Sequence, residues 1–188
     1  MTPAHDIIGS TPEGGTVKIG LEGSTGLTLL AFLSTGCLSC RDFWDAFAAE
    51  DLALPGGDTR LVIVSKNLEH ESTSQLIKLA PANHQTVAST EAWDAYNVPV
   101  SPYFILIDGP SGMTLGEGAA ATWPQVDNLL KQAMADLGVA PSGERQDQRA
   151  AGGEAREAKV DDDLAAAGIT PGHPSLYPGT DPDDEDPE

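Results

Sequence analysis

The chain has 188 residues, of which 40% are hydrophobic and 5% are aromatic, a composition typical of one globular domain of mixed strands and helices with an additional segment. Its net charge of −19 disfavours binding to nucleic acids and to anionic membrane surfaces, because both need basic patches on the protein. No run approaches the roughly 18 consecutive apolar residues of a membrane span. The sequence as written is therefore predicted to be soluble.

In the first half of the chain, strands are predicted to alternate with helices. Residues 1–15 are rich in Pro, Gly, Thr and Ser and are predicted to be an extended lead-in. The nearly continuous apolar run 27–33 is typical of a central strand that is covered on both faces. The other predicted elements are a half-buried strand at 16–21, a turn at 22–26, a helix at 41–50, a strand at 60–65 and a helix at 72–79. Strand 27–33, helix 41–50 and strand 60–65 form a parallel βαβ unit.

The second half predicts the remaining strands and a long helix. Short strand 85–88 and helix 90–96 are followed by two prolines near residue 100, which cannot continue a helix. Residues 103–107 form a clear strand, 113–118 a weaker partner strand, and 123–137 a helix that ends at Gly138. This helix presents Val126, Leu129, Leu130, Ala133, Met134 and Leu137 at helical spacing.

The character of the sequence changes at Pro141. Residues 1–140 carry 16 acidic and 6 basic residues, whereas 141–188 carry 13 acidic and 4 basic residues and lack a core-forming pattern. We therefore expect the folded domain to span 16–140 and residues 141–188 to be a largely disordered, acidic tail, with a short helix at 160–167.

Both cysteines of the chain lie together at Cys37 and Cys40, between the central strand and a helix. A helix N-terminus favours a thiolate, so we expect Cys37 to have a lowered pKa and to be the attacking sulfur, with Arg41 adding to this effect. Cys40 lies almost one turn further on and is the expected resolving thiol. The pair is predicted to be a redox dithiol that exchanges disulfides.

The order of elements around this dithiol resembles the thioredoxin fold. The residues that carry the resemblance are the CxxC at a helix start, the run Tyr96–Pro102 and the strand that begins at Tyr103, over about residues 8–138. Within this fold the order resembles the extracytoplasmic thiol–disulfide oxidoreductases called TlpA-like, and Gly36 resembles the accessory proteins of methylamine dehydrogenase maturation as much as TlpA itself. The resemblance implies an α/β fold with a central mixed sheet flanked by helices and an N-terminal β-hairpin.

The resemblance also implies a substrate-binding surface beside the dithiol. In that family a cis-proline opposes the two cysteines, and Pro102 is the matching position, with Ser101 before it. Gly36 and Trp44 complete the expected substrate-binding set. The sequence departs from the thioredoxin pattern at Gly36, usually Trp, and at Ala31, usually a buried acid, which favours a specialised oxidoreductase over a general thioredoxin.

Two other functions remain open at this point. A peroxiredoxin-like peroxidase needs a hydroxyl residue and a proline ahead of its reactive cysteine; Ser34 and Thr35 are near, but no proline lies between Leu27 and Cys37. A non-catalytic binding module with the same fold would use the groove beside Pro102. A structural zinc site would have to recruit His70 or His84 without a recognisable spacing, so we expect no metal.

No cofactor is predicted; the redox-active group is the disulfide between Cys37 and Cys40. The expected partners are a protein thiol or disulfide substrate and an upstream thiol that donates or accepts electrons, in cell redox homeostasis; the chain is expected to be a monomer. The first residues contain no signal region. Family resemblance implies an extracytoplasmic location if an anchor or signal precedes Met1, and otherwise a cytoplasmic one.

Overall fold

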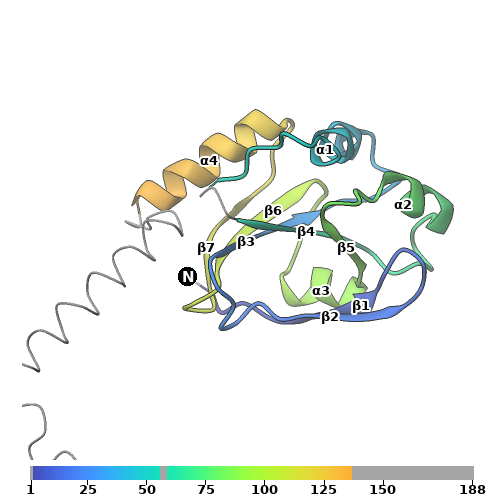
Figure 1. Ribbon diagram of the computed structural model, residues 1–188, viewed down its shortest axis with the longest axis horizontal. Coiled ribbons are helices and arrows are strands. Elements are labelled where there is room, and N and C mark those ends of the chain that lie inside the picture. The colour runs from blue at the N-terminus through green and yellow to red at the C-terminus, as the bar shows by residue number, and fades with distance from the viewer. Residues whose placement is uncertain (1, 56–58, 137–188) are drawn as a thin grey trace, which may run out of the picture. The chain divides into compact units, whose positions relative to one another are not determined.

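A seven-stranded sheet with helices on both faces is the framework of the protein (Figure 1). We analysed a computed structural model, in which residues 2–55 and 59–136 are described. Its strands are β1 (Ile7–Ser10), β2 (Thr16–Ile19), β3 (Leu27–Phe32), β4 (Arg60–Ser65), β5 (Gln85–Ala88), β6 (Tyr103–Asp108) and β7 (Met113–Gly118). Its helices are the 3-10 helix η1 (Leu38–Cys40), α1 (Arg41–Phe47), α2 (Thr73–Leu79), α3 (Thr90–Ala95) and α4 (Trp123–Asp136).

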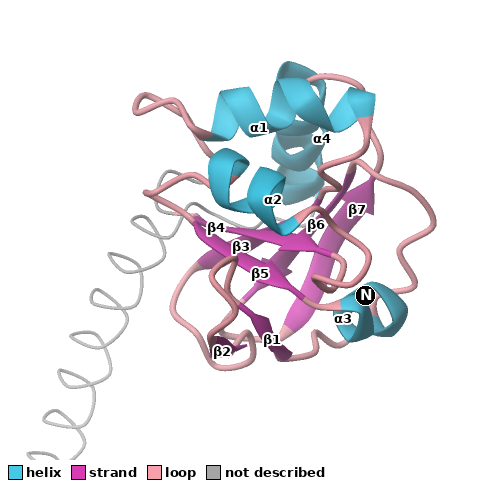
Figure 2. Ribbon diagram, turned by 90° about the vertical axis from the view of Figure 1, so that its right-hand side faces the viewer, coloured by secondary structure: helices cyan, strands magenta, loops and turns pink. Residues whose placement is uncertain are grey.

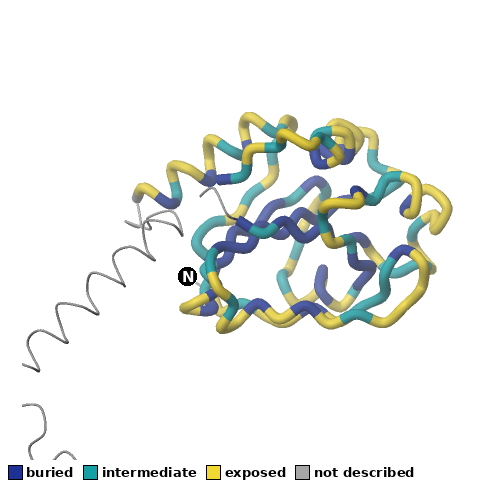
Figure 3. Tube along the Cα trace, in the orientation of Figure 1, coloured by how far each residue is buried: buried dark blue, intermediate teal, exposed yellow. Residues whose placement is uncertain are grey.

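The sheet is mixed, with strand order β2-β1-β5-β4-β3-β6-β7. Strand β3 pairs in parallel with β4 and antiparallel with β6, and all six of its residues are buried. Figure 3 shows buried positions concentrated in these central strands. The prediction of a central strand covered on both faces is confirmed, as is the mixed sheet flanked by helices.

Alternate residues of β3 belong to different cores. Leu29 and Ala31 pack in the core that α1, α2 and α4 cover, whereas Leu30 and Phe32 pack in the core that includes Trp93 of α3. Figure 2 shows the same division, with α1, α2 and α4 on one side of the sheet and α3 on the other. The strand therefore has no solvent-facing side, which explains why its sequence is apolar without alternation.

The expected N-terminal β-hairpin is present, but its first strand lies in the segment that was expected to be an extended lead-in. Strand β2 pairs antiparallel with β1. Ile7 is 1% exposed and belongs to the α3-side core. Burial of this side chain, together with the pairing of Ser10 with Ala88 of β5, makes β1 part of the sheet. The folded domain thus begins before residue 16.

Glycine at position 9 permits this pairing. A Cβ atom at Gly9 would collide with the carbonyl oxygen of Ala88 and lie 2.8 Å from Val87 Cγ2. The Ser89 hydroxyl, next along the chain, donates to the carbonyl oxygen of Ile8 at 2.7 Å. Strand β1 therefore approaches β5 more closely than a residue with a side chain would allow.

Two helices depart in detail from the prediction. Helix α1 ends at Phe47 rather than at residue 50. In α4, Val126, Leu130 and Met134 are buried as expected, but Leu129 is 53% exposed, because it lies at the edge of the apolar face. Leu137, the tail 141–188 and the predicted helix 160–167 lie outside the described residues.

Candidate functional site

The dithiol follows the end of the central strand. Leu33 continues the ladder by donating its N–H to the carbonyl oxygen of Val64 at 3.1 Å, and the chain then turns through residues 34–36. The Cys37 N–H donates to the carbonyl oxygen of Ser34 at 3.4 Å, and Cys37 directly precedes η1, which continues into α1. The strand and helix thus hold the two cysteines at the edge of the sheet.

Cys37 is the accessible thiol. Its side chain is partly exposed, and Sγ lies 3.5 Å from the hydroxyl of Ser39 and 3.6 Å from the carbonyl oxygen of Ser101. Burial alone would raise its pKa, but side-chain hydrogen bonds from Cys40 and Ser39 outweigh that effect and lower the pKa to about 7. At neutral pH a large fraction of Cys37 is therefore thiolate, the nucleophilic form.

Cys40 has the opposite environment. It is 0% exposed and packs in the core with Phe43 and Phe104. Burial, and then the hydrogen bond with Cys37, raises its pKa to about 12. Both cysteines are free thiols in the structure. The prediction that Cys40 is the more shielded of the two agrees with this burial.

The register between β3 and β6 places Ser101 and Pro102 beside the dithiol. Phe32 of β3 is paired with Tyr103 of β6, so the residues just before β6 lie next to those just after β3. The Ser101–Pro102 peptide bond is cis, and Pro102 is buried. Antiparallel pairing thus joins two segments that are far apart in the sequence.

A cleft of about 540 Å³ opens on one side of Cys37. It is lined by Gly36, Arg41 and Trp44, among others, and we call it the dithiol cleft. A Cβ atom at Gly36 would meet only the Ser34 hydroxyl, at 3.9 Å, so this part of the cleft is open. Trp44 is 2% exposed and forms its inner wall.

Arg41 lies exposed on the wall of the same cleft. Within the part of the chain that the structure describes, the groups that lower the pKa of Cys37 are hydrogen-bonding neighbours, of which Cys40 is the largest contributor, and Arg41 is not among them. The effect of Arg41 on the thiol therefore stays a prediction.

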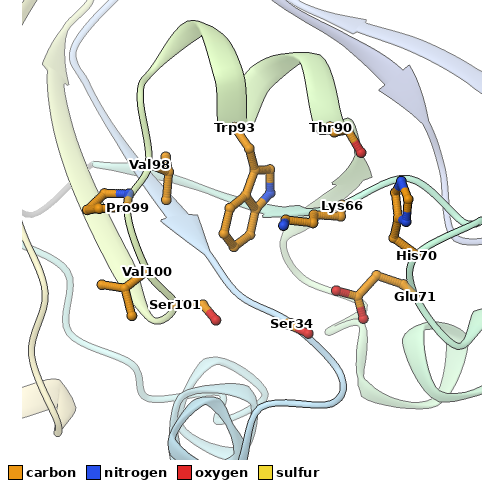
Figure 4. A pocket seen from close by; sticks show the side chains of 10 residues that line it. All are labelled: Ser34, Lys66, His70, Glu71, Thr90, Trp93, Val98, Pro99, Val100 and Ser101. Atoms are coloured by element: carbon orange, nitrogen blue, oxygen red, sulfur yellow. The ribbon is translucent and has the colours of Figure 1, made fainter.

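A second hollow, of about 480 Å³, has Ser101 in its lining (Figure 4). Its lining includes Ser34 and Ser101, together with Lys66, Glu71 and Trp93, and we call it the Trp93 hollow. The carbonyl oxygens of Ser34 and Ser101 also accept hydrogen bonds from Cys37, from its N–H and from its Sγ respectively. The Trp93 hollow thus shares two residues with the surroundings of Cys37.

The sequence did not indicate the Trp93 hollow or its charged residues. Glu71 accepts hydrogen bonds from the N–H of Thr35, at 2.9 Å, and from its hydroxyl. A weak signal existed, since Lys66 and Glu71 both follow a buried strand whose end lies at the same sheet edge as the dithiol. Their proximity to Ser101 depends on the pairing of β3 with β6, which sequence patterns do not report.

Neither histidine considered as a zinc ligand lies in a metal cluster. His70 lines the Trp93 hollow, and burial lowers the pKa of His84. Among residues 2–55 and 59–136, no group of three or more His, Cys, Asp or Glu side chains is arranged to hold a metal ion. The helices of this same part of the chain are too short or too polar to cross a membrane.

Solved structures of thioredoxin-like proteins share this fold. A putative thiol:disulfide interchange protein DsbE from Chlorobium tepidum has a TM-score of 0.54 and 20% identity, over 71% of this chain and 94% of its own. The exposed lipoprotein thioredoxin of Streptococcus pneumoniae has a TM-score of 0.54 and 15% identity, over 70% and 99%. A secreted disulfide oxidoreductase of Mycobacterium tuberculosis, homologous to DsbE of E. coli, has 0.51 and 16%, over 69% and 95%.

Searches with protein-family models and among curated proteins found no match to the sequence. At the identities above, the solved structures establish the fold alone. The resemblance to thioredoxin-like proteins of the TlpA and DsbE kind is confirmed at that level, and the chain has a thioredoxin-like fold.

Proposed function

We propose that the protein is a thiol–disulfide oxidoreductase that exchanges disulfides with protein substrates through Cys37 and Cys40. One observation carries the proposal: the two thiols have opposite environments. Cys37 is partly exposed with a pKa lowered to about 7, and Cys40 is buried with a pKa raised to about 12. This asymmetry suits a nucleophile that meets the substrate and a resolving thiol that waits behind it.

The reductive direction begins with attack by the Cys37 thiolate on one sulfur of a substrate disulfide. A Cys37–substrate disulfide forms and the other substrate sulfur leaves as a thiolate. Cys40 then loses its proton and attacks Cys37 Sγ, so that the Cys37–Cys40 disulfide forms and the second substrate thiolate leaves. Two electrons pass to the substrate, and the proton from Cys40 together with one proton from solvent converts the two substrate thiolates to thiols.

The proton on Cys40 needs an acceptor before the second step. Many thioredoxins have a buried acid at the position of Ala31. Ala31 is also buried, but its methyl side chain cannot accept a proton. Cys37 and Cys40 are hydrogen-bonded, so the loss of negative charge from Cys37 in the mixed disulfide removes a cause of the raised pKa of Cys40. The proton then passes to water or to another group that reaches Cys40 during the reaction.

The groups around the dithiol suit a protein substrate. We assign Gly36, Ser101 and Pro102 to its binding, since Gly36 and Ser101 lie beside the accessible sulfur and Pro102 follows Ser101, with Trp44 in the wall of the cleft. No cofactor beyond the Cys37–Cys40 disulfide is required. A dithiol or disulfide protein must restore the starting state after each cycle, and the secreted and lipoprotein relatives of this fold favour an extracytoplasmic location.

Trapping of mixed disulfides tests the two roles. Cys40→Ser should accumulate a covalent complex with a disulfide substrate such as insulin, because the resolving step is lost, whereas Cys37→Ser should trap none. Non-reducing electrophoresis and mass spectrometry of the linked peptides measure both. Equal trapping by the two variants would reverse or abolish the assignment, and no exchange with insulin or glutathione by the unmodified protein would reject the function.

A further inference from the structure

The Trp93 hollow contains a buried hydrogen-bond donor without a partner. Trp93 is 7% exposed, and its indole Nε1 has no hydrogen-bond partner among the described residues. Leaving such a donor unpaired in a folded protein is unfavourable. Figure 4 shows Trp93 in the wall of the hollow, beside Lys66. Among the described residues this N–H has no acceptor, and a ligand in the hollow can supply one.

Lys66 adds a positive charge to the same hollow. Its ammonium lies 5.2 Å from the centre of the Trp93 ring, and no carboxylate of the described residues lies within 4 Å of it. Lys18 and Lys131, by contrast, each form an ion pair. An unpaired lysine is notable here, because residues 1–140 carry 16 acidic residues and 6 basic ones.

Glu71 is the negatively charged group in the hollow. Its Oε2 accepts both hydrogen bonds from Thr35, so this oxygen is turned to the loop that leads to Cys37. The Thr90 hydroxyl accepts a hydrogen bond from Asn67 N–H at 3.0 Å and keeps its own proton to donate. Lys66, Trp93 and Thr90 therefore supply donors to one ligand.

The position of the hollow connects it to the chemistry of Cys37. Ser101 lines the hollow, and its carbonyl oxygen lies 3.6 Å from Cys37 Sγ. A peptide linked to Cys37 extends by about 3.3 Å per residue, so a residue one or two positions from its cysteine reaches the Ser101 edge of the hollow. A side chain of the substrate can thus enter it during the reaction.

We propose that the Trp93 hollow binds an acidic side chain of the substrate protein, within two residues of the cysteine that Cys37 attacks. The carboxylate accepts from the Trp93 indole and the Thr90 hydroxyl and pairs with the Lys66 ammonium. The inference deepens the proposed disulfide exchange and depends on it. It makes the protein selective for disulfides in acidic segments.

Two matched peptides test this selectivity. Each carries one cysteine linked by a disulfide to thionitrobenzoate, and the cysteine is flanked on both sides by Asp in one peptide and by Asn in the other. Attack of Cys37 on the peptide sulfur releases coloured thionitrobenzoate, so absorbance gives the rate. The measured quantity is the ratio of the Asp rate to the Asn rate, which cancels differences in thiol reactivity.

Lys66→Met should lower this ratio about fivefold, the size expected for one exposed charged pair. Lys131→Met is the control, because it removes the same charge from α4, outside both cavities, and should leave the ratio unchanged. Trp93→Phe should lower the ratio as well, since it keeps a ring and removes the N–H. An equal fall in Lys66→Met and Lys131→Met, or no fall in either, would overturn the subsite.

A spectroscopic measurement separates binding from rate. In the mixed disulfide of Cys40→Ser with the Asp peptide, the indole N–H resonance of Trp93, assigned by its absence in Trp93→Phe, should move downfield relative to the Asn complex. Identical positions in the two complexes would contradict the subsite. Failure of the unmodified protein to release thionitrobenzoate from either peptide would instead reject the oxidoreductase function.

Discussion

Glu71 accepts two hydrogen bonds from Thr35, one from its backbone N–H at 2.9 Å and one from its hydroxyl. Thr35 lies two residues before Cys37, in the turn that connects β3 to the dithiol, whereas Glu71 lies in the loop that connects β4 to α2. The carboxylate therefore fixes the reactive loop to a neighbouring strand connection. Neither residue reacts with the substrate, but both position the loop that leads to Cys37.

Replacement of Glu71 by Ala should destabilise the protein by about 1–3 kcal/mol, because it leaves two partly buried donors of Thr35 without an acceptor. Urea unfolding of the reduced protein measures this change. Glu71→Gln should recover much of it, since the amide oxygen can accept the same hydrogen bonds. Glu69→Ala is the control, an exposed acid in the same loop; equal stability of Glu69→Ala and Glu71→Ala would contradict the anchoring role.

The rate of alkylation of Cys37 should follow its lowered pKa. With iodoacetamide, the rate in the reduced protein should reach half its maximum near pH 7, since only the thiolate reacts. Ser39→Ala removes one of the hydrogen bonds that lower this pKa and should move the midpoint toward 9.0, the ordinary value. Ser74→Ala, on the exposed face of α2, is the matched control. An unchanged midpoint in Ser39→Ala would contradict a role for Ser39 and leave the lowered pKa to Cys40 and Ser101.

The stability of the reduced protein should depend on pH through both thiols. The Cys37 pKa is lowered from 9.0 to about 7, so between pH 7 and 9 the unfolded chain binds more protons and stability rises with pH. The Cys40 pKa is raised to about 12, so above pH 9 the folded state binds more protons and stability falls. Urea unfolding across this range, compared with the Cys37→Ser/Cys40→Ser double variant, isolates the two contributions. Parallel curves for the two proteins would contradict both shifts.

The central strands could be predicted because their sequences satisfy a simple condition. Strands β3, β4 and β6 are buried on both faces, so each is an apolar run bounded by turn residues. Strand β1 could not be predicted in the same way. Its sequence, Ile-Ile-Gly-Ser, is short and contains a strand-weakening glycine, and its place depends on contact with β5, which lies much later in the chain.

Only part of the candidate site could be predicted from the sequence. Cys37 and Cys40 are neighbours in the chain, so their spacing alone indicates a joint role. Ser101 and Pro102 were placed by family resemblance, and the pairing of β3 with β6 brings them to the dithiol. Glu71 lies in the loop between β4 and α2 and Trp93 in α3. Their roles depend on the donors that face one carboxylate and on the absence of a described acceptor for one indole N–H. Such details follow from packing, which a sequence pattern does not determine.

Replacement of Gly9 by Ala tests whether β1 is an integral part of the sheet. The added Cβ would collide with the Ala88 carbonyl oxygen, so β1 would have to move away from β5, with an expected loss of about 1–3 kcal/mol. Gly20→Ala is the control, because a Cβ there meets no atom within 4 Å and the change should be neutral or slightly stabilising. Hydrogen exchange of the β1 amides should quicken in Gly9→Ala alone. If both variants unfold at the same urea concentration as the unmodified protein, β1 contributes little to the fold, and the hairpin is an attachment to a sheet that is stable without it.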